Sequence, residues 1–198
     1  SSMREMIATI DAKKEAGRYE SFAEARTRAK AAREDQKKNA VSAPSAIENP
    51  VTTRLLEIQN TIKSKNYAQA EADLKQINKK NPSEPRVLFN IGRVAAITAE
   101  TIDGNVEAEK QKAKYLEAKN ASENVIRIAD ARYKESVVKN DASLRVDPAL
   151  VSLAFVSLGR IYEYYDQKSY AMGIYDAAIK LGDVVGGGYQ EALASKQR

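Results

Sequence analysis

Two stripes of packing residues between positions 155 and 178 constrain the fold more than any other part of the chain. The first stripe advances in steps of three and four residues and consists of Phe155, Leu158 and Tyr162. The second advances in the same way and consists of Ala171, Tyr175 and Ala178. Residues at these steps share one face of a helix. Since a polar turn at 166–168 separates the stripes, the pattern predicts a helical hairpin.

Gly159 lies inside the first of these predicted helices, where glycine costs about 1 kcal/mol relative to alanine. A glycine at such a position often marks the close approach of a second backbone. The combined spacing resembles the tetratricopeptide repeat (TPR), a helix–turn–helix pattern of about 34 residues. The residues that carry this resemblance are Leu158-Gly159, Tyr162, Ala171 and Tyr175.

The stretch departs from the family pattern at three positions. Phe155 stands in the place of the family's Trp, Tyr175 in the place of its Phe and Asp183 in the place of its closing Pro. The resemblance covers about residues 51–198 and implies an all-α fold. In TPR proteins, antiparallel helical hairpins stack in a right-handed superhelix, and the first helix of each hairpin lines a concave groove.

Three repeats and a capping helix are expected in this region. The predicted boundaries are 51–84 for the first repeat, 85–151 for the second, 152–185 for the third and 189–196 for the cap. From Ile58 to Gly92 the spacing is 34 residues, or one period. From Gly92 to Gly159 it is 67, so the middle repeat carries an insertion of about one repeat length. A cap is expected because a terminal repeat would otherwise expose an apolar face.

The insertion is predicted to have two parts, at 101–105 and at 133–148. Between them, 106–132 reads as one long helix, part of which should project beyond the stack. Its predicted buried side consists of Tyr115, Ala118, Ala121, Val125 and Ile128. After the third repeat, the run Gly186-Gly187-Gly188 predicts a flexible break before the cap.

A charged, helical N-terminal segment is predicted at 1–38, followed by a linker rich in Pro, Ala and Ser at 39–50. The segment fits a degenerate repeat, the tail of an upstream domain or a charged helical linker. Residues 1–40 hold ten Lys or Arg and seven Asp or Glu, so they carry most of the formal net charge of +5. The two signs are interleaved along the segment, which is typical of a solvated helix face and argues against a nucleic-acid surface.

The composition excludes several kinds of chemistry. The chain has no His and no Cys, which removes imidazole bases and the usual zinc and thiol sites. It also lacks the glycine-rich phosphate-binding motifs. We therefore predict a protein that is not an enzyme and uses no cofactor or metal. No apolar run approaches the roughly 20 residues of a membrane span. The chain reads as a soluble piece of a longer protein without a targeting signal, and the sequence assigns neither a compartment nor an oligomeric state.

The resemblance also implies which residues face the groove. The candidates for partner binding are Gln59, Lys63, Asn90, Arg93, Arg160 and Tyr164. Arg93 and Arg160 each follow the repeat Gly, so they should lie on adjacent turns of the groove wall with Asn90 beside them. Some TPR proteins hold chaperone carboxylates with a clamp of two Lys, two Asn and an Arg. Only Asn90 matches that clamp, which argues against this specificity.

Two functions follow from these observations. The first is a non-catalytic scaffold that binds a protein or peptide partner through the groove, including a partner with acidic groups. The second is a structural appendage or spacer of a larger protein, an enzyme included, that has no ligand of its own. The second would be favoured if the 106–132 helix or the N-terminal helix filled the groove. In that case Arg93 and Arg160 would only extend over apolar surface into water.

Overall fold

The computed structural model describes residues 50–197, which form seven α-helices and a short 3₁₀ helix. Contacts divide the chain into two units, 1–49 and 50–198, and the second is described by itself. The predictions for 1–38 and for nearly all of the 39–50 linker lie outside the described residues. The helices are α3 Pro50–Lys63, α4 Tyr67–Lys80, α5 Pro85–Thr101, α6 Ala108–Lys139, η1 Ala142–Leu144, α7 Pro148–Tyr164, α8 Lys168–Lys180 and α9 Tyr189–Lys196.

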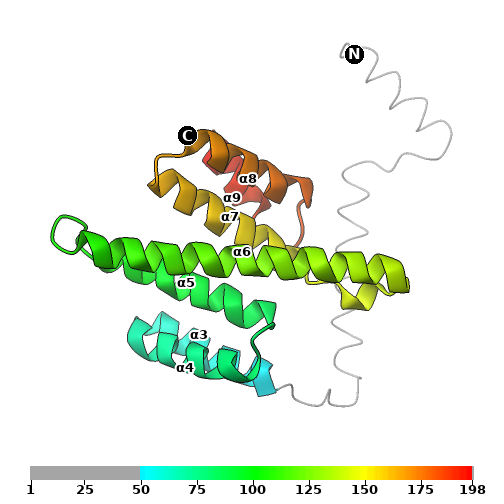
Figure 1. Cartoon of the computed structure of the whole chain (residues 1–198), viewed down its shortest axis with the longest axis horizontal. Coiled ribbons are helices and arrows are strands. Elements are labelled where there is room, and N and C mark those ends of the chain that lie inside the picture. Colours follow the sequence, from blue (N-terminus) through cyan, green and yellow to red (C-terminus); the bar gives the residue numbers. More distant parts are fainter. Residues whose placement is uncertain (1–49, 198) are drawn as a thin grey trace, which may run out of the picture. The chain divides into compact units, whose positions relative to one another are not determined.

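Each helix packs antiparallel against the next one in the chain. The long α6 crosses the middle of the unit, with α3, α4 and α5 on one side and α7, α8 and α9 on the other (Figure 1). The described residues contain no strand. The predicted all-α class is therefore confirmed for residues 50–197.

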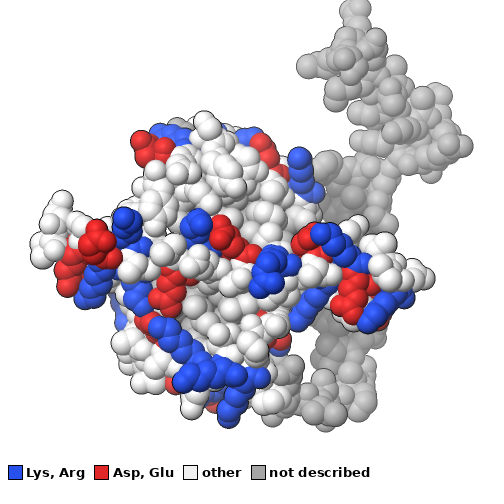
Figure 2. Space-filling model, in the orientation of Figure 1, with Lys and Arg blue, Asp and Glu red and all other residues white. Residues whose placement is uncertain are grey.

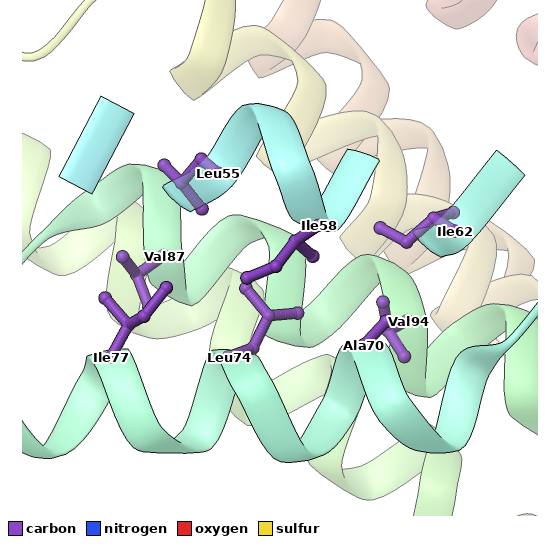
Figure 3. Close-up of a cluster of buried hydrophobic side chains, with 8 residues drawn as sticks. All are labelled: Leu55, Ile58, Ile62, Ala70, Leu74, Ile77, Val87 and Val94. Carbon is purple, nitrogen blue, oxygen red and sulfur yellow. The ribbon is translucent and has the colours of Figure 1, made fainter. Parts of the chain in front are cut away.

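The hairpin of α3 and α4 has an apolar core to which α5 contributes. Figure 3 shows the side chains of α3 pointing toward α4, with two valines of α5 completing the cluster. Its members are Leu55, Ile58, Ile62, Ala70, Leu74, Ile77, Val87 and Val94. Burying one such aliphatic side chain contributes about 1.5–3 kcal/mol. The turn between the helices places Lys65 at φ 60°, and the Asn66 side chain then caps α4 by accepting from the amide of Gln69.

The helix after α5 is longer than the sequence predicted. α6 begins at Ala108 and continues to Lys139, so the predicted end of this helix at 132 is wrong by seven residues. Ion pairs between residues one helical turn apart stabilise this charged extension. Lys134 lies 2.6 Å from Asp130, and a second pair joins residues 135 and 139. Asn140, at φ 51°, then ends the helix. Most of the extra length between α5 and α7 is therefore helix, and α6 projects beyond the helices beside it (Figure 1).

Gln111 holds the loop between α5 and α6 in place. Its amide nitrogen donates to the carbonyls of Ala99 and Ile102, at 3.1 and 2.9 Å, and so satisfies free acceptors at the end of α5. Its amide oxygen accepts from the hydroxyl of Tyr164 on α7, at 3.1 Å. A Cβ on Gly104 would lie 2.5 Å from the same oxygen, which accounts for the glycine in this loop. One side chain thus joins three helices.

α7 begins at Pro148, within the stretch predicted to be an insertion. Proline is favoured in the first turn of a helix, and the Asp147 carboxylate caps it by accepting from the amide of Ala149 at 2.9 Å. The segment 142–164 has the length and mean hydropathy (1.3) that would allow a membrane span. However, α7 itself has only 17 residues and packs against α6, α8 and α9, as a core helix does.

The glycine run separates α8 from α9, as the predicted break implies, and its last two residues are closely packed. Gly188 is buried, its amide donates to the Ser152 hydroxyl at 3.0 Å, and a Cβ there would lie 2.6 Å from Val156. The close approach lets α9 fold back onto α7 and α8. The buried residues of α9 are Ala192 and Ser195, whereas Tyr189 and Leu193 are half-buried.

Candidate functional site

A cleft of about 360 Å³ lies between α5 and α7. Both helices are the first members of their hairpins, and α6 and α9 each contribute to its edges. The cleft is lined by Phe89, Arg93, Ala96, Ile97, Glu100, Tyr115, Leu153, Val156, Ser157, Arg160, Ile161, Tyr164 and Glu191. Its lining therefore combines apolar side chains with charges of both signs.

Two arginines at equivalent positions line the cleft. Arg93 follows Gly92 on α5, and Arg160 follows Gly159 on α7. No carboxylate of the described residues lies within 4.0 Å of Arg93. Arg160 instead pairs with Glu191 of α9 at 2.9 Å, and both side chains are about half exposed, at 56% and 50%. One arginine is thus free of a carboxylate partner, and the other is held by the last helix.

Two stacked tyrosines form part of the cleft lining. The rings of Tyr115 on α6 and Tyr164 on α7 lie 3.8 Å apart with an angle of 28° between them. Tyr164 is fixed further by its hydrogen bond to Gln111. Burial raises the pKa of the Tyr115 hydroxyl, and the negative charge of Glu100 adds to this effect. This part of the cleft lining is therefore aromatic and is held in place from two helices.

The structure brings together three of the six residues predicted to bind a partner. Arg93, Arg160 and Tyr164 line the α5–α7 cleft. Gln59 and Lys63 lie on α3, outside the cleft lining.

Asn90 is the clearest difference from the predicted site. It is only 6% exposed and does not line the cleft, so its expected place beside the two arginines is wrong. The reason is helix periodicity, because Asn90 lies three residues after Val87 and four before Val94, which both face the core of the first hairpin. Its amide nitrogen donates to the Arg86 carbonyl at 2.8 Å, and its oxygen has no hydrogen-bond partner in the described part of the chain.

Sequence reasoning missed the two acids and the α6 tyrosine of the cleft. Glu100 lies in the last turn of α5, and its spacing of seven residues from Arg93 could have placed it on the same face. Glu191 and Tyr115 come from other helices, and no periodicity within α5 or α7 could have found them. Among residues 50–197, no cluster of three or more Asp or Glu is placed to hold a metal ion.

Comparisons of the chain with protein-family models, curated proteins and solved structures find no match.

Proposed function

We propose that this chain is a non-catalytic, TPR-like scaffold that binds an extended peptide in the α5–α7 cleft. The observation that carries the proposal is that Arg93 and Arg160, which occupy equivalent positions in two hairpins, line one cleft with an apolar wall. The proposal includes a right-handed stacking of the hairpins, which would make the cleft part of a concave groove. First helices of successive hairpins form such a groove in TPR proteins.

The chemistry of the lining defines the peptide. Phe89, Ile97 and Leu153 offer apolar contact, so the peptide should carry at least one aliphatic or aromatic side chain. Arg93 lacks a carboxylate partner within the described residues and is therefore the first candidate to meet an acidic group. Arg160 becomes available only when a peptide carboxylate replaces Glu191, and the half-exposed pair is of the kind that contributes little to stability.

One observation favours the alternative of a structural appendage. Arg160 is already paired with Glu191 of the same chain. This pairing is expected if the two charges only hold α9 against α7. Against this alternative, α6 packs as the second helix of the α5 hairpin and leaves the cleft open rather than filling it. Nucleic acid is a poor fit for the cleft, because Glu100 and Glu191 would repel phosphates.

A displayed library of random 12-residue peptides, selected on the full chain, tests the proposal. Selected peptides should combine an acidic residue with an apolar one. The double variant Arg93→Ala/Arg160→Ala should bind them several-fold more weakly and with a flatter salt dependence, since the charges that salt screens are gone. The matched control is Lys79→Ala/Lys80→Ala, which removes two exposed cations from α4, away from the cleft lining. Equal loss in both double variants, or no loss in either, would contradict the proposal.

A further inference from the structure

A second, larger cleft lies on the other side of α7. It encloses about 550 Å³ and is lined by Ile126, Ala129, Asp130, Tyr133, Arg145, Val146, Pro148, Val151, Phe155 and Leu181. α7 supplies Leu153 and Val156 to the first cleft but Val151 and Phe155 to this one. Since successive residues of a helix are about 100° apart, these two sets face in different directions. The two clefts are therefore separate surfaces.

The extension of α6 beyond its predicted end builds one wall of this second cleft. Tyr133 lies in that extension, and η1 and the loop to α7 pack beside it. In Figure 2, charged side chains of both signs follow α6, whereas the surface between this helix and α8 is largely uncharged. Exposed apolar side chains continue the surface, since Tyr133 is 53% exposed and Leu181 is 37% exposed. Apolar surface of this kind on a charged protein indicates a contact site.

One cation at the rim of the cleft is held in place without a carboxylate partner. The Arg145 side chain donates from Nε to the hydroxyl of Ser136 at 2.9 Å, and its guanidinium lies 5.0 Å from the centre of the Tyr133 ring. No carboxylate of the described residues lies within 4.0 Å of Arg145. The acid in the cleft lining, Asp130, is already paired with Lys134 at 2.6 Å. Arg145 is thus oriented by uncharged groups, and its terminal nitrogens meet no carboxylate of residues 50–197.

We propose that this second cleft binds a segment of a protein partner that places an aliphatic or aromatic side chain against Val151, Phe155 and Leu181 and a nearby carboxylate on Arg145. The cleft volume suits one large side chain and its neighbours. A preorganised guanidinium favours a carboxylate because two parallel hydrogen bonds can form. The ring of Tyr133 keeps the guanidinium at the cleft edge, so little side-chain freedom would be lost on binding.

The test is a second selection of random 12-residue peptides on the full chain. The chain carries the Arg93→Ala/Arg160→Ala double substitution, so that peptide binding to the α5–α7 cleft is weakened. Peptides with an acidic residue within about three positions of a large apolar residue should be enriched. Arg145→Gln should reduce their affinity at least several-fold, Arg145→Lys should reduce it less, and Leu181→Ser should reduce it through lost apolar contact. Because Leu181 lies at the partly exposed C-cap of α8, its replacement should leave the fold intact, which the melting temperature checks.

Several results would overturn this inference. The selection could enrich no peptides, or it could enrich peptides that lack an acidic residue. The enriched peptides could also bind the Arg145→Gln variant with the same affinity as its parent. Dodecanoate offers a further check. If it displaces the selected peptides, and if Arg145→Gln and Leu181→Ser weaken its binding as they weaken peptide binding, the cleft would be assigned to a fatty acid instead of a protein segment. The protein used in this selection lacks both arginines of the α5–α7 cleft. A negative result therefore leaves the proposal for the α5–α7 cleft intact, and a negative result for that cleft leaves the present proposal intact.

Discussion

The α5–α6 and α7–α8 hairpins place a glycine at the same position of their first helix but use it in different ways. At Gly92, an added Cβ would lie 3.1 Å from the Cβ of Ala121 and 3.3 Å from the carbonyl of Ala118, so two backbones approach each other through small residues. At Gly159, an added Cβ would lie 2.5 Å from a ring carbon of Tyr175. The same pattern therefore accommodates a close helix crossing in one hairpin and a buried ring in the other.

This difference predicts different tolerance to substitution. The neighbours of Gly92 are compact, and a shift of a few tenths of an ångström would accommodate one methyl group. Tyr175 is fully buried, with a relative exposure of 0%, and its hydroxyl is held by Glu163 at 3.0 Å, so its ring has nowhere to move. The α7–α8 hairpin should thus be the more sensitive of the two.

The largest effect is expected for Gly159→Leu. The new side chain would collide with the Tyr175 ring and push α7 and α8 apart, which should lower the free energy of unfolding by about 1–3 kcal/mol or more. Urea unfolding followed by circular dichroism measures this. A variant more stable than the wild type, as expected from helix propensity at an exposed glycine, would contradict the packing of this hairpin.

A smaller effect is expected for Tyr175→Phe, which keeps the ring and removes the hydrogen bond to Glu163. The loss should be about 1 kcal/mol near neutral pH. Burial, with the Glu163 hydrogen bond as a second cause, raises the pKa of Tyr175 to about 12. Because the folded state holds this proton more tightly than the unfolded state, the stabilisation is complete below about pH 10 and is lost as the pH rises toward 12.

Unfolding of the wild type and of Tyr175→Phe at pH 8 and at pH 11.5 measures this dependence. The wild type should be the more stable protein at pH 8, and its advantage should shrink at the higher pH. An advantage that grew with pH would show that the Tyr175 hydroxyl ionises more readily in the folded protein than we infer.

The smallest effect is expected for Gly92→Ala. Tight contact with Ala121 and the gain in helix propensity of about 1 kcal/mol oppose each other, so the net change should stay within about 1 kcal/mol. The matched comparison is Gly159→Ala, measured by the same urea unfolding. If Gly92→Ala destabilises the chain more than Gly159→Ala does, the contrast between the two hairpins is wrong.

Local periodicity was enough to predict most of the individual helices. Both stripes of the 155–178 stretch lie on helices, and the turn near 166–168 is present, with Asp166 at φ 57°. The capping helix runs from Tyr189 to Lys196, as predicted. These features depend on neighbours within one or two turns, which the sequence displays directly. The identity of the chain as a TPR protein stays a prediction.

The misplaced features depend on contacts between distant parts of the chain. The long helix was predicted to end at Arg132, whereas ion pairs within α6 and contacts with η1 extend it to Lys139. The break at the glycine run was predicted, but the close packing of Gly188 on α7 was not. Likewise, the pairing of Arg160 with Glu191 depends on how α9 folds back, which no local pattern specifies.

The most direct test of the central claim is the affinity of an acidic peptide, selected on the wild-type chain, for the Glu191→Gln variant. If the peptide carboxylate competes with Glu191 for Arg160, this variant should bind several-fold more tightly. Adding Arg160→Ala should remove the gain, and the melting temperature should change little because the pair is half exposed. Unchanged or weaker binding by Glu191→Gln would contradict the assignment of the α5–α7 cleft as the peptide site.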